Sequence, residues 1–313
     1  MNLLAYLKKF FSRIHYLVFV LQRIRRHPLN SNHKFLSIIN FFCWHIGKRL
    51  LRKEIIVPWV DDCKFIMGSD DIQFRWNIYI GLFEYEDMLF FLHALRPENI
   101  FVDVGANVGA YTILSSKVVN AKSVAFEPLP ETFERLKNNI NVNRIADRVV
   151  IKNLGVADKI GSVYFTNNRG VQNKVNLTNK RGSDTTNVSV TTLDSELSEN
   201  NDLFLKIDVE GYELNVIEGA KNILSSKRFL ALIIEFSGIG EEFGYSNDML
   251  HKKLTLFNLI PIKYDPLTRQ IIKLNDYNKK SLNTIYVKDI KKIQKLCLSA
   301  PKRTIHTAHN ILI

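Results

Sequence analysis

Two short segments of this sequence combine carboxylates with glycines in a pattern that suits a ligand site. The first places Asp103 shortly before Gly105 and Gly109, and the second reads Lys206-Ile-Asp-Val-Glu-Gly211. Glycine lets the backbone turn tightly and approach a ligand closely. Each segment ends an apolar run, and in an open α/β sheet ligands bind at the carboxyl ends of the strands. The pattern predicts a site at two strand ends, and its acids favour a cationic ligand.

The glycine spacing argues against the two common phosphate-binding loops. A dinucleotide-binding loop reads GxGxxG, whereas Asn107 and Ala110 stand where its second and third glycines would be. A P-loop continues from its glycine to Lys-Ser or Lys-Thr, whereas Gly109 is followed by Ala110 and Tyr111. An oxidoreductase is therefore the least favoured class of enzyme.

The elements that would position these residues alternate between strand and helix from residue 99 onward. Strands are expected at 100–104, 123–126, 149–151, 203–207 and 230–236, with 262–264 and 284–287 closing the sheet. Helices are expected at 111–119, after Pro130, at 213–224 and at 249–257. Such alternation indicates right-handed βαβ units and a mostly parallel sheet.

The residues before this pattern have a different character. Apolar periodicity predicts helices at 1–26, 35–51 and 85–95, and β-branched and aromatic residues predict short strands within 55–82. The polar stretch 167–187 is expected to be a loop, either over the active face or without a role.

Four segments, in order, resemble the motifs of the FkbM-type S-adenosylmethionine-dependent methyltransferases. They are Phe101-Val-Asp-Val-Gly-Ala-Asn-Val-Gly109, Ala125-Phe-Glu-Pro128, Thr191-Thr-Leu-Asp194 and Leu205-Lys-Ile-Asp-Val-Glu-Gly-Tyr-Glu213. The resemblance implies an α/β Rossmann-like class I methyltransferase fold, with helices on both faces of a mostly parallel sheet and an N-terminal helical and β lead-in. It also implies S-adenosylmethionine as the cofactor. The expected domains are a basic helical segment with the lead-in at 1–95, the S-adenosylmethionine-binding methyltransferase domain at 96–290 and a basic tail at 291–313.

The resemblance also implies roles in cofactor binding. Asp103 would lie near the positive amino end of the methionine part, and Glu127 would accept hydrogen bonds from ribose hydroxyls, as acids after the second strand of dinucleotide enzymes do. Residues 153–156 follow the third strand, where the family places the adenine ring, although the family more often has alanine at the position of Gly155. The predicted cofactor site comprises Asp103, Gly105, Ala106, Asn107, Gly109, Glu127, Asn153, Gly155 and Val156.

The second acidic segment is predicted to hold the catalytic residues. Methyl transfer needs the acceptor aligned against the methyl group and, for a hydroxyl acceptor, a group that takes its proton. Asp208 or Glu210 is the predicted base, and Lys206, on the same side of the strand as Asp208, would orient the acid. Glu213 and Glu235 are further acids near this edge, and Glu213 suits a structural role at a helix N-terminus equally well.

The rest of the composition points to no metal site. Hydrophobic residues make up 46% and charged residues 24% of the 313 residues, as is usual for a globular protein. Cys43, Cys63 and Cys297 lie far apart without a CxxC pair, and the histidines form no ligand motif. We therefore expect no metal ion, and reduced thiols in a cytoplasmic protein.

Positive charge is concentrated at the start of the chain. The net charge is +12, yet residues 1–60 hold eleven Lys and Arg residues and a single acid, Glu54. An export signal is not expected, because the apolar run at 16–21 is short and no cleavage site follows. The apolar stripe and cations of residues 1–26 predict peripheral contact with the inner membrane face. Pairing with a partner helix and packing on the catalytic domain remain alternatives.

The function expected from the resemblance is O-methylation of a hydroxyl on a sugar, a cell-surface glycan or a secondary metabolite. The acceptor would be a glycan, a lipid-linked glycan or a small molecule. A nucleic-acid methyltransferase is less favoured, because the chain lacks the Pro-Pro motif of amino-methylating enzymes. A non-catalytic binding protein is also less favoured, because both acidic segments are intact.

Overall fold

The computed structural model describes residues 3–51, 54–68, 72–166, 174–176, 182, 184–197 and 201–313. The chain divides into two compact units. The smaller is formed by Met1–Phe83 together with Lys302–Ile313, and the larger is formed by Glu84–Pro301.

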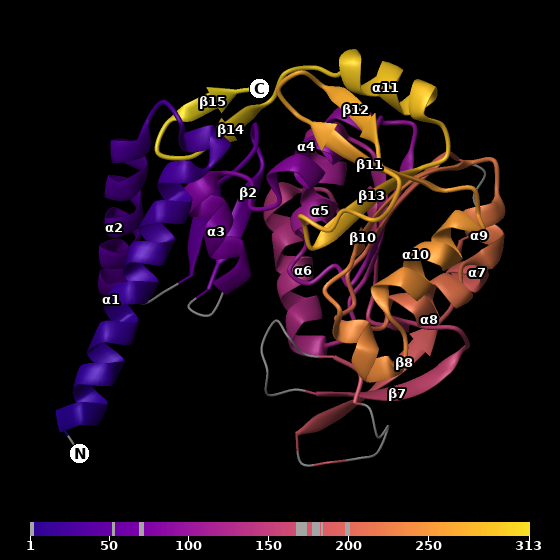
Figure 1. Ribbon diagram of the computed structural model, residues 1–313, viewed down its shortest axis with the longest axis horizontal. Coiled ribbons are helices and arrows are strands. Elements are labelled where there is room, and N and C mark those ends of the chain that lie inside the picture. Colours follow the sequence, from indigo (N-terminus) through magenta and orange to yellow (C-terminus); the bar gives the residue numbers. More distant parts are fainter. Residues whose placement is uncertain are drawn as a thin grey trace. The chain divides into compact units, whose positions relative to one another are not determined.

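An eight-stranded sheet forms the centre of the larger unit, in the order β12-β11-β13-β10-β9-β3-β4-β5 (Figure 1). Its five consecutive parallel strands are β3 (Ile100–Val104), β4 (Lys122–Phe126), β5 (Val149–Lys152), β9 (Leu203–Ile207) and β10 (Phe229–Glu235). The remaining strands are β11 (Ile260–Asp265), β12 (Gln270–Lys273) and β13 (Asn283–Val287). Because β13 runs antiparallel to both β10 and β11, the sheet is mixed but mostly parallel, which confirms the predicted fold class.

Helices cover both faces of this sheet (Figure 1). The helical segments of the larger unit are α4 (Tyr85–Ala94), α5 (Ala110–Ile113) with a π-helical continuation at Leu114–Val119, α6 (Pro130–Asn143), α7 (Leu193–Glu196), α8 (Glu213–Glu218), α9 (Lys221–Ser225), a 3-10 turn at Ile239–Phe243, α10 (Asn247–Thr255) and α11 (Ile290–Leu298). Strand alternation explains the two layers. Val102 and Val104 pack in the cluster that holds residues of α8 and α10, whereas the Phe101 ring contacts that of Phe91 in α4.

A second, three-stranded sheet lies in the same unit, in the order β6-β8-β7. Its strands are β6 (Gly155–Val156), β7 (Gly161–Thr166) and β8 (Thr185–Thr191). The loop expected at 167–187 is therefore shorter than predicted, because β8 already begins at Thr185. Residues 167–173, 177–181 and 183 of that loop lie outside the described part of the chain.

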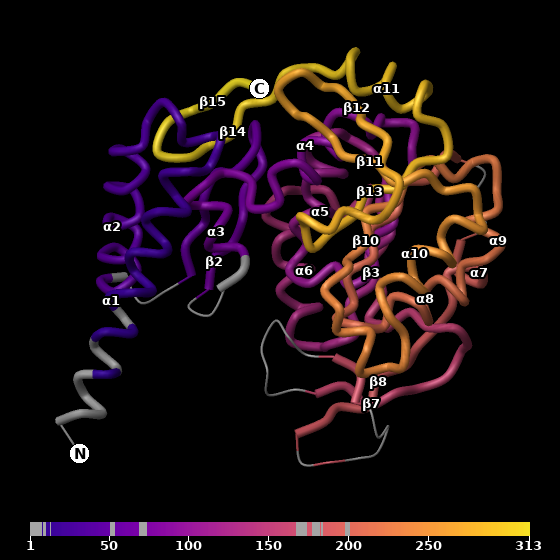
Figure 2. The backbone as a smooth tube through the Cα atoms, viewed as in Figure 1, coloured from indigo at the N-terminus to yellow at the C-terminus, as the bar shows by residue number. Residues whose placement is uncertain are grey.

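The described residues of the smaller unit form three α-helices and two hairpins. Its elements are α1 (Leu3–Arg26), a 3-10 turn at Pro28–Asn30, α2 (Lys34–Leu51), β1 (Ile55–Pro58), β2 (Lys64–Met67), α3 (Ile72–Ile80), β14 (Thr304–His306) and β15 (Asn310–Leu312). Figure 2 lets the reader follow the chain from α1 to the C-terminal hairpin. That hairpin joins this unit through a bridge between Ile305 and Val60 and through the hydrogen bond from the His306 N–H to the Trp59 carbonyl.

The strands predicted within 55–82 are confirmed by β1 and β2. The prediction is wrong for residues 72–80, which form the helix α3. The aromatic and β-branched residues that suggested a strand are those that a helix here packs inward. Tyr79 and Ile80 join Val20 and Ile24 of α1 and Phe41 of α2 in one buried cluster. Tertiary packing has overridden local β-propensity.

Part of the apolar stripe predicted for residues 1–26 lies inside this cluster. Ile24 is buried, and Leu17 and Leu21 pack against the cluster. The side chains of Leu3, Leu7 and Phe10 lie outside the described part of the chain. No helix in the described residues is long and apolar enough to cross a membrane.

Candidate active site

The carboxyl ends of β3 and β9 place the two acidic segments side by side. In the parallel register of these strands, Asp103 is the partner of Lys206. The Asp103 carboxylate is buried, and the Thr112 hydroxyl donates a hydrogen bond of 2.7 Å to its Oδ2. Burial raises the pKa of Asp103 to about 6, although the Lys206 ammonium and the Thr112 hydroxyl lower it.

The turn that follows β3 needs its glycines. Gly105 has a φ of +79°, and a Cβ atom there would overlap the backbone oxygen of Asp208. Gly109 has a φ of +94°, and a Cβ atom would lie 2.5 Å from the Leu136 side chain in α6. Between them Asn107 also adopts a positive φ of +51°, and the buried Ala106 packs with Leu136. The backbone is thus held close to the strand ends.

Glu127, at the end of β4, is fixed by this same turn. Its Oε2 accepts the Asn107 N–H and its Oε1 accepts the Leu129 N–H, both at 3.0 Å. Burial raises the pKa of Glu127 to about 7 although these two bonds lower it. Each carboxylate oxygen has more than one acceptor site, so Glu127 can still accept bonds from ribose hydroxyls.

The predicted adenine-binding residues lie just beyond β5. The Asn153 side-chain amide donates to the carbonyls of Glu127 and Pro128, at 2.9 and 3.0 Å. Gly155 and Val156 form β6, which pairs with Val190 and Thr191 of β8. The Val156 side chain is buried in the main apolar cluster, so Asn153 is the more exposed, polar part of this group.

Lys206 and Asp208 form an ion pair of 2.7 Å at the end of β9. Lys206 is buried, and its ammonium lies 5.0 Å from the centre of the Tyr111 ring. Burial alone lowers the pKa of Lys206, but the carboxylates of Asp208, Glu84 and Asp103 outweigh it and raise this pKa above its ordinary value. The lysine therefore stays charged as the cation of an acidic neighbourhood.

Two acids that the sequence analysis missed belong to this neighbourhood. The Tyr111 hydroxyl donates to Glu84 Oε2 at 2.7 Å, and the Asn283 amide donates to Glu84 Oε1 and to Asp87 Oδ2. Burial and the Glu84 carboxylate raise the pKa of Asp87. In the sequence, these residues read as acids at the start of a helix, which the helix dipole favours anyway. Only the burial of Asp87 could have distinguished them, and that depends on the tertiary fold.

Glu213 has a structural role in the turn from β9 into α8. Its Oε1 accepts the N–H groups of Val209 and Gly211, and its Oε2 accepts the Tyr245 hydroxyl at 2.7 Å. The Tyr245 hydroxyl also lies 3.1 Å from the Gly211 carbonyl. Of the two roles that the sequence allowed for Glu213, these contacts favour the structural one.

Glu210 and Glu235 are two further acids at this edge, and burial together with neighbouring carboxylates raises the pKa values of both. Glu210 has a φ of +53°, and burial together with Asp208 and Glu213 raises its pKa to about 7. Burial and the acids Asp208, Glu213 and Glu210 raise the pKa of Glu235 far above its usual range. Glu235 Oε2 is buried and makes no hydrogen bond within the described residues.

This edge of the sheet fits a cationic cofactor. Lys206 supplies an ammonium group at this edge, and more residues supply carboxyl groups. These acids are Glu84, Asp87, Asp103, Asp208, Glu210 and Glu235. Burial and neighbouring carboxylates raise the pKa values of Asp87, Asp103, Glu210 and Glu235, which indicates that the chain does not fully compensate the negative charge buried here. S-adenosylmethionine carries a sulfonium and an ammonium, so it would supply the missing positive charge. Within the described residues, no group of three His, Cys, Asp or Glu side chains is arranged to hold a metal ion.

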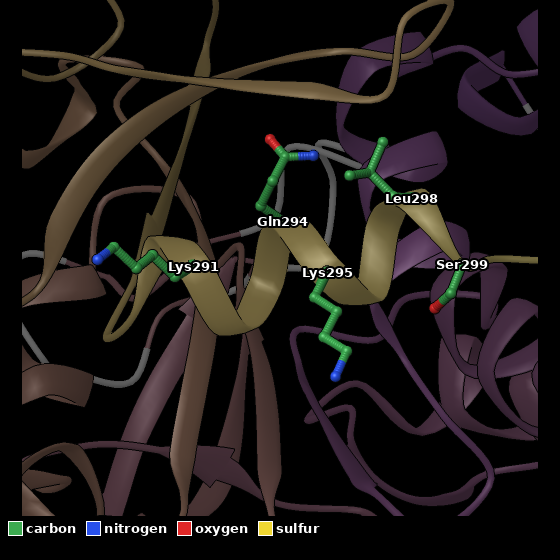
Figure 3. Close-up of a pocket in the computed structure, with 5 residues that line it drawn as sticks. All are labelled: Lys291, Gln294, Lys295, Leu298 and Ser299. Carbon is green, nitrogen blue, oxygen red and sulfur yellow. The ribbon is translucent and has the colours of Figure 1, made fainter.

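A surface pocket on α11 lies away from these residues. It is lined by Lys291, Gln294, Lys295, Leu298 and Ser299 (Figure 3). The guanidinium of Arg96, which precedes β3, bonds to the Leu296 carbonyl and to the Ser299 hydroxyl. The pocket therefore lies toward the amino ends of the strands, at the edge opposite the candidate active site.

Comparison with known proteins identifies the family. A family model described as the methyltransferase FkbM domain matches residues 103–277, more than half of the chain. The hexuronic acid methyltransferase AglP of Haloferax volcanii is 29% identical over 51% of this chain and 65% of its own. Methyltransferase sdnD of Sordaria araneosa is 30% identical over 39% of this chain and 61% of its own. The match thus spans less than two thirds of the length of both relatives.

Solved structures are more distant. The crystal structure of precorrin-6y C5,15-methyltransferase from Geobacter metallireducens has a TM-score of 0.36 and 10% identity, and covers 65% of this chain and 87% of its own. The family match is therefore the decisive finding. Methyltransferases of this family use S-adenosylmethionine, which confirms the predicted cofactor. The chain belongs to the methyltransferase FkbM domain family.

Proposed function

We propose that this protein transfers a methyl group from S-adenosylmethionine to a hydroxyl of a sugar, a cell-surface glycan or a secondary metabolite. Family membership supports methyl transfer, and the names of the two relatives support a glycan or small-molecule acceptor. The observation that carries the proposal is the placement of Glu210, whose pKa is raised to about 7, near the Lys206–Asp208 ion pair. We place the reaction in the cytoplasm, where a lipid-linked glycan would be reached at the inner membrane face.

The chain provides a cradle for the cofactor, which supplies an electrophilic methyl group when bound. Asp103 and the turn through Gly105 would hold the methionine part by charge and by backbone N–H groups. Glu127, already oriented by two backbone donors, would accept bonds from the ribose hydroxyls. Asn153 and the β6 residues Gly155 and Val156 would border the adenine ring.

Glu210 is the proposed general base. A base works best when its pKa lies near the working pH, and the pKa of Glu210 meets that condition. Asp208 is less suited, because taking up a proton would break its 2.7 Å ion pair with Lys206. We assign Lys206 and Asp208 to positioning the acceptor, with the proton of the acceptor hydroxyl passing to the Glu210 carboxylate.

The substitution Glu210→Gln tests this assignment. It preserves size and removes the base, so kcat should fall by about 10²–10⁴, while calorimetric affinity for S-adenosylmethionine stays unchanged. Glu134→Gln, on the exposed side of α6, is the matched control and should leave both quantities unchanged. If Asp208→Asn abolishes turnover while Glu210→Gln is nearly silent, Asp208 is the base and the assignment is wrong.

The nature of the acceptor group needs a product analysis. A uronic acid offers both hydroxyl and carboxyl oxygens, and the two methylated products differ in chemistry. Methyl should be transferred from labelled S-adenosylmethionine to a glycan or sugar acceptor as an ether that survives mild alkali. Release of the label as methanol under alkali would show an ester and would overturn O-methylation of a hydroxyl.

A further inference from the structure

A continuous apolar stripe runs along the outward face of α2 in the smaller unit. Exposure of its side chains lies between 41% and 77%, and its members are Phe35, Ile39, Phe42, Ile46 and Leu50. Steps of four, three, four and four residues keep them on one face of a helix. At 1.5 Å per residue the stripe is about 22 Å long. Single exposed apolar residues are ordinary, but a contiguous row indicates a surface that contacts something.

The stripe is not the face by which α2 packs in its own unit. On the other side of the helix Ser37 and Phe41 are buried, and the Phe41 ring meets the Tyr79 ring of α3 at 5.0 Å. On α1, the buried residues Val20 and Ile24 face the same cluster. The inner face of α2 therefore packs in the core of the smaller unit, and the residues of the outer stripe take no part in that packing.

The charges around the stripe favour an anionic partner. Residues 1–53 contain eleven Lys and Arg residues and no Asp or Glu. In the described part of the chain, six of these cations lie on α1 and α2 with exposed side chains, namely Lys8, Arg23, Arg25, Arg26, Lys34 and Arg49. Two copies of such a surface would repel each other and lack the acids that pair helices across an interface. Interfacial helices on anionic membranes combine an apolar face with basic residues. Here α2 supplies the apolar face, and Lys34 and Arg49 supply exposed cations near its two ends.

We propose that the α2 stripe, with the cations of α1 and α2 beside it, docks this protein on an anionic lipid surface. The stripe residues enter the boundary between headgroups and acyl chains, and the cations pair with lipid phosphates. This shifts the expected membrane contact from α1, whose second half packs in the core, to α2. The inference goes beyond the proposed methyl transfer, because its readout is binding to lipid and does not require turnover.

Vesicle co-sedimentation of the full chain tests the proposal. The protein should pellet with vesicles of phosphatidylcholine and phosphatidylglycerol, and much less with phosphatidylcholine alone, and added salt should release it. The variant Ile39→Gln/Phe42→Gln/Ile46→Gln should lose at least tenfold in partitioning. A control variant removes three apolar side chains of the larger unit that are even more exposed, as Ile160→Gln/Leu256→Gln/Leu267→Gln, and should bind like the parent.

A second variant separates charge from apolar insertion. Each cation near an anionic leaflet contributes roughly fivefold to binding, so Lys34→Gln/Arg49→Gln should weaken partitioning by up to about 30-fold. The same variant should also reduce the salt dependence of vesicle binding. Unchanged denaturant unfolding followed by tryptophan emission shows that the smaller unit of each variant is folded, because Trp44, Trp59 and Trp76 all lie in it.

Three results would overturn the proposal. The first is a parent protein that does not distinguish anionic from neutral vesicles. The second is a folded stripe variant that binds vesicles as well as the parent. The third is a stripe variant that changes from dimer to monomer in sedimentation equilibrium with its vesicle binding intact, which would assign the stripe to a second copy of the chain.

Discussion

Glu210 and Gly211 form a pair of residues with positive φ, +53° and +97°, directly after the Lys206–Asp208 ion pair. For glutamate this left-handed conformation is uncommon, and it fixes where the carboxyl group is held. Lys174 contributes to the same electrostatic balance, since its ammonium lowers the pKa of Glu210. Lys174 is itself paired with Glu242 at 2.5 Å. The protonation of Glu210 thus depends on Lys174, which lies in the segment that connects β7 to β8.

Activity should therefore rise with pH as Glu210 loses its proton, with a midpoint near 7. The substitution Lys174→Met removes a positive charge, raises the pKa of Glu210 and should move this rising limb to higher pH. Glu242→Gln is the control, because it keeps the ammonium and should move the limb to lower pH or leave it in place. The pH dependence of kcat under saturating substrate measures the shift. A limb that does not respond to Lys174→Met would show that another group sets it.

At the scale of elements, the junction between β9 and α8 depends on one tyrosine. The Tyr245 hydroxyl donates to Glu213 at 2.7 Å, and Glu213 in turn accepts two backbone N–H groups of the turn. Tyr245→Phe should lower the free energy of unfolding by about 1–3 kcal/mol, since it leaves a buried carboxylate short of a donor.

A double-mutant cycle with Glu213→Gln separates this bond from general packing. If the two groups act through their contact, the losses in the single variants will not add in the double variant. Denaturant unfolding provides the four free energies. Additive losses would mean that Tyr245 acts through its ring alone.

Much of this element pattern could be predicted from the sequence, because strong apolar periodicity decides it. The parallel strands, α4 and α6 were expected close to where they occur, since Pro130 and the short apolar runs mark them. The single helix expected at 213–224 is divided into α8 and α9. The failure at α3 has a tertiary cause, because Tyr79 and Ile80 are placed in the core by α1 and α2. The strand β8 was missed, and its first residues, from Thr185, lie in the polar stretch that was expected to be a loop.

The candidate site was predictable only in part. Asp103, Glu127 and the acids of the second segment carry recognisable spacing, and the structure gathers most of them at one sheet edge. Glu84 and Asp87 reach that edge from a separate helix through Asn283, and sequence spacing says nothing of such a contact. Their roles in binding and catalysis stay predictions until the variants are measured.

At the scale of the whole molecule, the two units should respond to pH in opposite directions. In the smaller unit burial lowers the pKa of His27 to about 4, below its ordinary 6.5. The contribution of His27 to the free energy of unfolding is therefore fully present above pH 6.5 and is lost as pH falls toward 4, because the unfolded chain takes up the proton more readily. In the larger unit Glu127 and Glu210 have pKa values raised from 4.5 to about 7. Their contribution is present below pH 4.5 and is lost as pH rises through 7.

Fluorescence can follow one unit alone, because Trp44, Trp59 and Trp76 all belong to the smaller unit. Denaturant midpoints from tryptophan emission should fall between pH 6.5 and 4, and His27→Gln should flatten that dependence. Midpoints from loss of S-adenosylmethionine binding, which reports the larger unit, should fall between pH 5 and 8. Parallel pH dependences of both signals would contradict independent titration of the units.

The return of Lys302–Ile313 to the smaller unit has a consequence for synthesis on the ribosome. Gly81 lies so close to the side chains of Ile305 and Thr307 that a Cβ atom on it would be 2.8 Å from both, and this part of the smaller unit therefore stays uncovered until residues 302–313 emerge. All of Glu84–Pro301 must be translated in between, which takes roughly 10 to 45 s at 5 to 20 residues per second. During that interval the nascent smaller unit exposes apolar surface that the finished chain covers, and it is the natural target for chaperones that bind such surface.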